Sequence, residues 1–293
     1  MENELWKKVY QKVTEVARNR SLKRATYTHA DIVLTYLWAV LHDRPIYWAC
    51  KKTNWPIYYR RKPLPNPSTM TRRLRTLHIQ KLLREIESHL VNLIPRSVCR
   101  YIDAKPLPIG GCSKDKQSKF GRGASCIARG YKLYAVSDIQ QGFVQWTIRP
   151  MNQNEAKVAT DLISNLDSGG YLVGDGAYDS NRLYDIASKR SVQLIACHRK
   201  KGKALGHRRH SPYRLRSREL LERPFGQSLI KGRTSIERMF GNLVSFAGGL
   251  KPLPHWVRTL FRVELWVRSK MILITCGDWE MNNLYHGRCK KLI

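Results

Sequence analysis

Three acidic residues occupy positions in this sequence where carboxylates could do chemistry. Asp103 and Asp175 each come directly after a short run of residues that is typical of a β-strand, and Glu237 lies at the edge of the apolar stripe of a predicted helix. In α/β sheets, ligands tend to bind beyond the carboxyl ends of strands. We therefore expect the two aspartates to face a common site, with Glu237 reaching over the strand ends.

Carboxylates that converge would repel one another strongly unless cations lie between them. Mg²⁺ prefers carboxylate oxygens, and two ions about 4 Å apart can hold both the attacking and the leaving oxygen of a phosphoryl displacement. Each acid also has an ordinary interpretation. Asp103 could close a strand, Asp175 could form an Asx-turn, and Glu237 could pair with Arg233 one turn earlier. The spacing alone leaves these alternatives open.

The elements that would position the acids follow a mixed α/β order. From residue 98 we predict three strands, a helix, a strand, a helix and a strand: 98–102, 131–136, 143–148, a helix capped by Asn154, 171–174, a helix from 179 or 180, and 192–196. Asp103 closes the first strand, which Pro106 and Pro108 then stop. A further helix begins at roughly Arg233. This order suits a mixed sheet that begins antiparallel and gains parallel strands through helical crossovers.

The first 97 residues indicate helices. Apolar residues recur at helical spacing over 32–41 and 82–94, on either side of a proline-rich break. Ser68-Thr69 is a predicted helix N-cap, and Arg72, Arg73 and Arg75 fall on the first turns of the helix that follows. Such a helix could enter the major groove of DNA, as in helix-turn-helix proteins. The alternative is a solvated basic face on an ordinary helical bundle.

The charge of the whole chain points to a polyanionic partner. Lys+Arg 53 against Asp+Glu 22 gives a net charge of +31, which favours nucleic acid over a membrane surface. The sequence has no apolar stretch of about 18 residues that could span a bilayer. Residues 1–97 carry +12, residues 98–197 carry +4 and residues 198–293 carry +15. Two basic thirds thus flank a nearly balanced middle third, which holds Asp103 and Asp175.

The basic charge is densest in residues 198–218, which hold nine Lys or Arg and no acid. We favour an arm that contacts phosphates, because each phosphate it neutralises would release counterions. The alternative is a mobile, solvated loop. Gly202, Gly206 and Pro212 argue against a continuous helix. The candidate contacts in this arm are Arg199, Lys200, Lys201, Arg208 and Arg209.

The seven cysteines are scattered, and none of them forms a Cys-x-x-Cys pair. This spacing excludes a disulfide framework and favours reduced thiols in a cytoplasmic protein. The start of the chain has acids and lysines that interrupt any apolar run, so it does not have the pattern of a signal peptide.

Three sequence segments together resemble a known family. They are Tyr-Ile-Asp103-Ala-Lys-Pro, then Gly-Asp175-Gly-Ala-Tyr178-Asp-Ser, then Gly-Arg233-x-x-Ile-Glu237-Arg238-x-Phe-Gly-x-Leu. The set is similar to the DDE transposases of bacterial insertion sequences over about residues 98–250. The resemblance implies a ribonuclease-H-like catalytic domain, preceded by a mainly helical region that binds DNA.

The resemblance also implies a role for each matching residue. Asp103, Asp175 and Glu237 would bind two Mg²⁺ ions, with Mn²⁺ as a substitute, to nick the element's end and then join its 3′-hydroxyl to target DNA. Arg233 and Arg238 would steady the Glu237 helix or contact phosphate. Tyr178 would contact DNA or pack in the core. The sequence departs from the family at Ile230 and Val244, where many relatives have a Tyr and a Lys. The phosphate contacts of that pair are then absent or come from elsewhere, such as the 198–218 arm.

The expected organisation is a helical DNA-binding region at 1–97, a catalytic domain at 98–275 and a C-terminal tail at 276–293. The expected partner is double-stranded DNA, both the transposon ends and the target, with a homodimer acting on two ends and no membrane. Such a protein would work in the bacterial cytoplasm at the nucleoid.

Two other functions fit the same residues. A metal-dependent nuclease would cut nucleic acid with the same three acids but without strand transfer. A domesticated element would bind DNA without any metal-dependent cleavage, although retention of all three acids counts against it. A basic ribosomal or RNA-packaging protein fits the charge but gives no reason for the placement of the acids.

Overall fold

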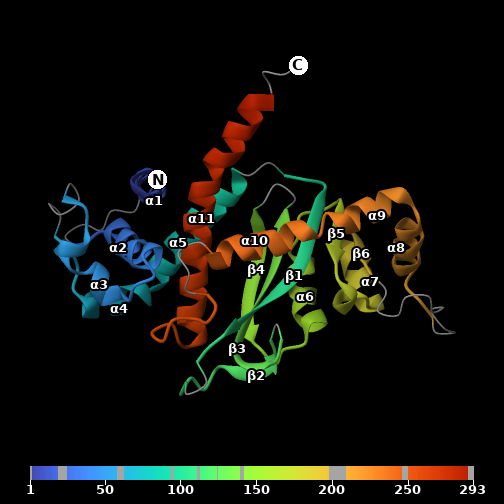
Figure 1. Ribbon diagram of the computed structural model, residues 1–293, viewed down its shortest axis with the longest axis horizontal. Helices are drawn as coiled ribbons and strands as arrows, with labels where there is room; N and C mark the ends of the chain where they lie inside the picture. Colours follow the sequence, from blue (N-terminus) through green and yellow to red (C-terminus); the bar gives the residue numbers. More distant parts are fainter. Residues whose placement is uncertain are drawn as a thin grey trace. The chain divides into compact units, whose positions relative to one another are not determined.

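The computed structural model describes residues 2–18, 25–57, 63–93, 96–110, 113–123, 125–138, 142–197, 209–245 and 250–289 (Figure 1). The chain divides into two compact units. The first combines residues 1–93, 245–249 and 265–293, and the second combines residues 94–244 and 250–264. No helix in the described ranges is long and apolar enough to cross a membrane.

The first unit is helical, as the apolar spacing predicted. Its elements are α1 (Glu2–Ala17), α2 (His29–Leu41), α3 (Ile46–Ala49), η1 (Lys52–Asn54), α4 (Pro67–Leu74), α5 (Leu77–Asn92) and most of α11 (Leu260–Cys289). Helix α2 begins with a capping box between Thr28 and Asp31, which satisfies two backbone donors that would otherwise lack partners. All but two of its side chains are buried, so α2 is the central helix of this unit.

The start of α4 differs from the prediction by two residues. Asn66, not Ser68 or Thr69, is the N-cap, because its side-chain oxygen accepts a hydrogen bond from the Thr69 backbone N–H at 2.8 Å. Pro67 then takes the first helical position, where its missing N–H costs nothing. The helix is only eight residues long.

The predicted boundary at residue 275 falls inside a helix. Helix α11 runs without interruption from Leu260 to Cys289, and residues 265–293 belong to the first unit. Trp266, Met271 and Cys276 are all buried, so apolar packing continues through the position where the sequence suggested a separate tail. The second compact unit ends at residue 264, before the boundary that the sequence suggested for a catalytic domain.

The second unit is built on a six-stranded mixed sheet. Its strands are β1 (Cys99–Pro108), β2 (Lys119–Arg122), β3 (Ile127–Asp138), β4 (Phe143–Pro150), β5 (Tyr171–Gly174) and β6 (Gln193–Ala196). The order is β2-β3-β1-β5-β6, with β4 also paired to β3. Strand β3 is antiparallel to β1, β2 and β4, whereas β5 is parallel to β1 and β6. This is the predicted change from antiparallel to parallel pairing, and it is compatible with a ribonuclease-H-like domain.

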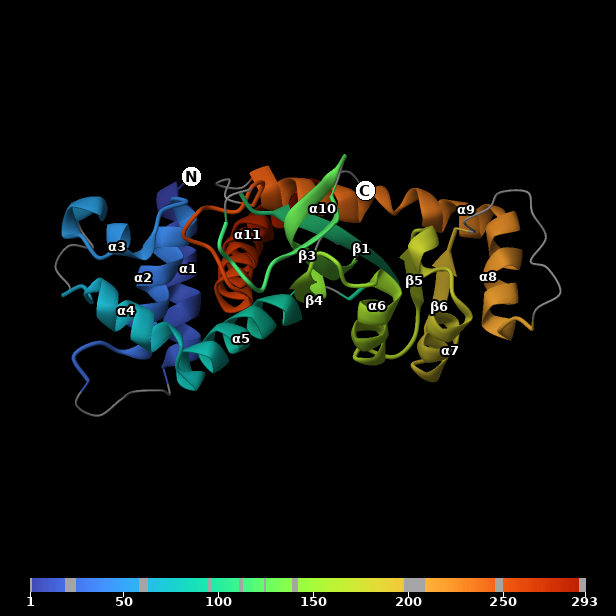
Figure 2. The ribbon, with the colours of Figure 1, turned by 90° about the horizontal axis from the view of Figure 1, so that it is seen from below.

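Helices cover both faces of this sheet. They are α6 (Glu155–Ser164), η3 (Gly176–Tyr178), α7 (Asn181–Lys189), α8 (Pro212–Glu222), α9 (Pro224–Lys231) and α10 (Thr234–Ser245). Figure 2 shows α6 and α7 on one face and α10 on the other. Asn154 caps α6 as predicted, since its side chain accepts from the Lys157 N–H.

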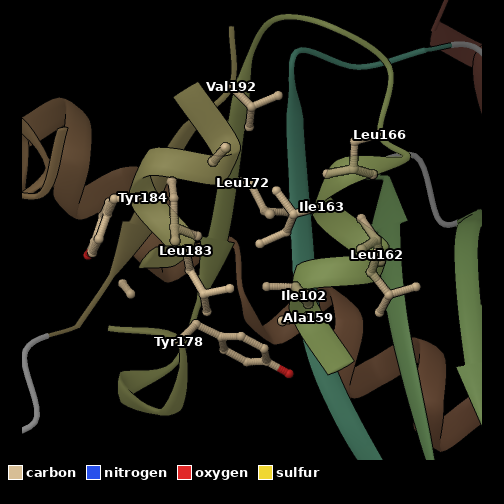
Figure 3. Close-up of a cluster of buried hydrophobic side chains, with 14 of the residues drawn as sticks. Ile102, Ala159, Leu162, Ile163, Leu166, Leu172, Tyr178, Leu183, Tyr184 and Val192 are labelled. Atoms are coloured by element: carbon tan, nitrogen blue, oxygen red, sulfur yellow. The ribbon is translucent and has the colours of Figure 1, made fainter. Parts of the chain in front are cut away.

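The core beneath α6 and α7 is apolar and closed (Figure 3). Ile102 from β1 and Leu172 from β5 point into it and meet Leu162, Ile163 and other buried side chains of the two helices. Because side chains alternate along a strand, the residues next to Ile102 and Leu172 face the other side of the sheet. That alternation places Asp103 on the face covered by α10.

Strand β1 is longer than predicted and does not end at Asp103. It pairs with β3 from Arg100 to Pro108, through both Pro106 and Pro108. On its other side it pairs with β5 only over Cys99–Tyr101. Proline is tolerated where its nitrogen faces no partner strand, so the two prolines do not stop β1. Asp103 consequently lies in the middle of a strand, where the β5 neighbour has already ended.

Helices α8 and α9 were not predicted. Part of the 198–218 segment is helical, because α8 begins at Pro212. Pro212 occupies the first turn of α8, where proline starts a helix instead of breaking one. Residues 198–208 of this segment lie outside the described residues.

Candidate active site

The register of two parallel strands brings Asp103 and Asp175 together. Tyr101 on β1 pairs with Val173 on β5, so Asp103 and Asp175, each two residues further on, continue the same register. Asp103 has Ala135 of β3 directly opposite on its other side. Both aspartates therefore lie on the α10 face of the sheet, at the point where β5 ends. The two acids meet as the sequence predicted.

Asp175 also performs the ordinary role that the sequence left open. One of its carboxylate oxygens, Oδ1, accepts a hydrogen bond from the Ala177 N–H at 2.8 Å and caps the short helix η3. Within the described part of the chain, Oδ2 has no hydrogen-bond partner. The Asx-turn thus fixes the direction of the side chain and leaves one oxygen available for a ligand.

Glu237 lies on the exposed side of α10, next to the buried stripe of that helix. Ile236 and Phe240 face the sheet, and the Phe240 ring lies 5.6 Å from that of Phe143 on β4. Glu237 accepts a hydrogen bond from Arg233 at 3.0 Å, one turn earlier. Both the expected edge position and the expected pairing are present.

The approach of α10 to the sheet depends on a glycine. Gly232 lies in the turn just before α10, and a Cβ atom there would stand only 2.0 Å from the Tyr101 hydroxyl oxygen. Tyr101 is two residues before Asp103 on the same face of β1. The absence of a side chain at Gly232 lets the start of α10, with Arg233 and Glu237, lie directly against the strand that carries Asp103.

The electrostatics of Asp103 show that the three acids interact. Its pKa is raised from 3.8 to about 6, mainly by burial and also by the negative charges of Asp175 and Glu237. The Ala104 N–H, which donates to Oδ1 at 2.8 Å, and the positive charge of Arg233 oppose this rise. The charges of Asp175, Glu237 and Arg233 therefore all affect the ionisation of Asp103.

A divalent cation would relieve this repulsion, and the donor set suits a hard ion. Carboxylate oxygens are the ligands that Mg²⁺ and Mn²⁺ prefer. Among the described residues no three His, Cys, Asp or Glu side chains are already close enough to hold a metal ion. Glu237 is paired with Arg233 instead, so joining the aspartates around a cation requires its side chain to leave that partner.

The structure distributes the predicted DNA contacts unevenly. Arg233 lies at the acids, and Arg238 is exposed on α10 next to Glu237. Tyr178 is 1% exposed and packs beneath the sheet, close to Ile102, Ala159 and Leu183 (Figure 3). Of its two expected roles, the structure shows packing in the core, which leaves the ring no surface for DNA.

The remaining predicted contacts lie in the two basic regions. Arg209 is exposed just before α8, whereas Arg199, Lys200, Lys201 and Arg208 lie outside the described residues. Arg72 and Arg75 are exposed on and after α4, and Arg73 is half-buried near the Tyr27 carbonyl. These three arginines belong to the first unit, and a role for them in binding DNA stays a prediction.

Two features of the site were missed in the sequence. Lys105 lies two residues after Asp103 on the same face of β1, where burial and nearby Lys251 lower its pKa and Asp103 opposes that effect. Arg214 of α8 makes two hydrogen bonds of 2.7 Å to the carboxylate of Asp179, in the loop that follows Asp175. Asp179 belongs to the sequence motif that contains Asp175. Its partner Arg214 could not be predicted, because helix α8 was not predicted.

Comparison with known proteins agrees with this geometry. A family model described as a transposase DDE domain matches residues 95–261. The match covers more than half of the chain and contains all three acids. The chain belongs to the DDE transposase family. No curated protein and no solved structure matches the chain. The matched range of the transposase covers the whole sheet, α10 and the Arg214–Asp179 ion pair.

Proposed function

We propose that this transposase cuts the ends of a bacterial insertion sequence and joins them to target DNA, with Asp103, Asp175 and Glu237 as its metal ligands. The observation that carries the proposal is that the negative charges of Asp175 and Glu237 both act on the buried carboxyl of Asp103. The register of β1 and β5 aligns the aspartates, and both Asp175 and Glu237 raise the pKa of Asp103. Burying a carboxylate beside two others is costly without a cation, so a metal role explains the arrangement better than three separate structural roles.

In such a phosphoryl transfer, each group of the chain at the site would have its own role. When bound, two Mg²⁺ ions, or Mn²⁺ in their place, would activate the attacking oxygen and stabilise the leaving oxygen. The backbone N–H groups of Ala104 and Ala177 orient the two aspartates. Arg233, once Glu237 turns to the metal, is free to donate to a phosphate oxygen. The partner that fits this chemistry is double-stranded DNA.

The proposed assembly follows from the reaction. Joining an element to a target needs two ends held together, so we expect a homodimer on DNA, working in the cytoplasm at the nucleoid. Short inverted repeats on either side of the gene would identify the ends that it cuts.

The decisive test is cleavage and joining by the full-length protein. The substrate is labelled DNA carrying the element's terminal repeats, with Mg²⁺ or with EDTA. Asp103→Asn, Asp175→Asn and Glu237→Gln should each reduce cleavage by at least about 10³-fold and leave DNA affinity within about threefold, because the charge removed is not a phosphate contact. Asp185→Asn, an exposed α7 acid, is the matched control. A triad variant that retains near-normal cleavage would remove that residue from the ligand set.

A second assay separates transposition from simple cutting. Pre-cut ends with a free 3′-hydroxyl are mixed with plasmid target, and joined product is measured. A wild-type protein that cuts but never joins is a nuclease, and this result would overturn the transposase proposal while retaining the metal site.

A further inference from the structure

The second unit carries exposed apolar residues on a narrow two-stranded ribbon. The ribbon comprises residues 113–123 and 125–129, with β2 paired to the first residues of β3, at the β2 end of the sheet in Figure 1. Phe120 is 66% exposed and Ile127 is 77% exposed. Proteins usually protect edge strands against pairing with other chains. Large apolar side chains on such an edge suggest a contact surface.

The base of the ribbon is held firmly. The Asp115 carboxylate accepts hydrogen bonds from the Tyr131 hydroxyl at 2.7 Å and the Thr259 N–H at 2.8 Å. The Arg129 guanidinium donates to the Ser113 carbonyl, the Asp115 carbonyl and the Ser118 hydroxyl. These contacts fix where the exposed tip points, as a binding element requires.

The exposed residues lie on the same face of the sheet as the catalytic acids. Phe120 pairs with Arg129, and Arg122 pairs with Ile127. Arg129 is six residues before Ala135, the residue opposite Asp103, and residues an even number apart share a face. Six residues span about 20 Å of strand, a distance covered by about six base pairs of duplex.

The other face of the ribbon is occupied by protein. A Cβ atom on Gly121 would stand 2.3 Å from the Met151 carbonyl oxygen, so this face lies against the backbone after β4. The Arg129 guanidinium lies 5.9 Å from the centre of the Phe120 ring and holds the ring in the outward position.

The positive charge of the ribbon favours a negatively charged partner. Lys114, Lys116, Lys119 and Arg122 are exposed, whereas the only acid between residues 104 and 137 is Asp115, which is 7% exposed and bonded at the base. Such a surface complements a polyanion that also offers apolar sugar and base surfaces.

We infer that the β2–β3 ribbon is a second DNA-contacting element, which binds the duplex on the same face of the sheet as the acids. Lys114, Lys116 and Arg122 contact phosphates, and Phe120 and Ile127 pack against sugars or base edges in a groove. This inference rests on the proposed function, because it takes DNA as the substrate of the acids on the same face.

The first test reverses charge on the ribbon of the full-length protein. Lys116→Glu/Arg122→Glu is compared with Lys157→Glu/Lys189→Glu, two exposed lysines of α6 and α7 on the opposite face. The probe is a mixed-sequence duplex of about 40 base pairs. The ribbon variant should lose at least about tenfold in affinity at about 0.1 M salt, with the slope of log K against log salt reduced by about 2. The control should change affinity by less than about threefold.

The second test asks what Phe120 touches. Phe120→p-benzoylphenylalanine is irradiated with labelled duplex, and the same photoreactive residue at position 157 is the control. Cross-linking to DNA at position 120 but not at 157 supports the inference. Cross-links to a second copy of the chain, or a ribbon variant that binds DNA like the wild type, would overturn it.

Failure of this inference is distinguishable from failure of the proposed function. Mg²⁺-dependent cleavage by the wild type is measured with each binding experiment. If the wild type cleaves DNA and the ribbon variants bind it normally, only the inference that the ribbon contacts DNA is contradicted. Binding that depends on the ribbon in a protein that never cleaves contradicts only the proposed function.

Discussion

The negative charge of Asp103 is costly to the folded protein, mainly because the carboxyl is buried and also because Asp175 and Glu237 are nearby. Its pKa of about 6 in the folded chain, against 3.8 as the ordinary value, means that the folded state binds its proton more tightly than the unfolded state does. Stability is therefore lost as pH rises from 3.8 through 6, and the loss remains at neutral pH. Two pKa units correspond to up to about 3 kcal/mol. The charged Asp103 thus lowers the free energy of unfolding of the metal-free protein, as functional sites often do.

Asp103→Asn should therefore stabilise the metal-free protein at about pH 7 by roughly 1–3 kcal/mol and have little effect near pH 3, where the carboxyl is mostly protonated in both states. Urea unfolding in EDTA at the two pH values measures this difference. Asp185→Asn, at an exposed position on α7, should change stability by less than about 0.5 kcal/mol. An equal loss of stability for Asp103→Asn at both pH values would show that the pKa shift is absent.

At the scale of elements, the loop after β5 is tied to α8 by the Arg214–Asp179 pair. The two side chains are 14% and 5% exposed and form a bidentate contact. Removing one partner of such a pair leaves a buried charge uncompensated. Because Asp179 and the metal-ligand candidate Asp175 share this short loop, the pair connects α8 to the loop that positions Asp175.

Arg214→Gln should destabilise the protein by about 2–4 kcal/mol and reduce cleavage more than DNA affinity. The neighbouring exposed pair between Arg223 and Glu219, 64% and 61% exposed, provides the control. Arg223→Gln should cost less than about 0.5 kcal/mol. Chemical unfolding and single-turnover cleavage measure the two effects. Equal stability of the two variants would show that the Arg214 contact is not formed in solution.

The sequence predicted the elements with strong periodicity and missed those set by tertiary context. The hairpin of β3 and β4 and the helix stripes of α6 and α10 are local patterns, so each was found near its observed place. Pro106 and Pro108 misled the prediction because no single sequence shows that β5 ends before them. Pro212 misled it because proline both breaks helices and begins them.

In the candidate site too, features marked by local sequence patterns could be predicted, whereas features set by tertiary contacts could not. The three acids could be found because acids are scarce in this basic chain, and because Asp103 and Asp175 follow recognisable strand patterns while Glu237 lies on a recognisable helix. The role of Gly232 could not, because its value lies in the distance to the Tyr101 hydroxyl across the fold. Likewise, the core position of Tyr178 depends on packing against α6 and α7.

At the scale of the whole molecule, the chain has a net charge of +31, whereas the candidate site is built on acidic residues. The positive excess favours binding to DNA, whereas the acids of the candidate site would repel phosphate unless cations neutralised them. Binding and cutting should therefore respond to different ions. Monovalent salt should weaken binding, and removal of divalent cations should stop cleavage without abolishing binding.

The 198–218 segment allows the binding part of this argument to be tested. Changing Arg199, Lys200, Lys201, Arg208 and Arg209 together to Gln removes five positive charges, which should reduce the slope of log K against log salt by about 4. Affinity should fall at least about 100-fold at 0.1–0.2 M salt, because these charges would no longer displace counterions. A matched variant with Lys157, Arg182 and Lys189 changed to Gln on α6 and α7 should reduce the slope by less than about 1. Titrations at four salt concentrations measure both slopes. An unchanged slope in the five-residue variant would leave the segment as a solvated loop and assign the binding to the helical unit and the β2–β3 ribbon.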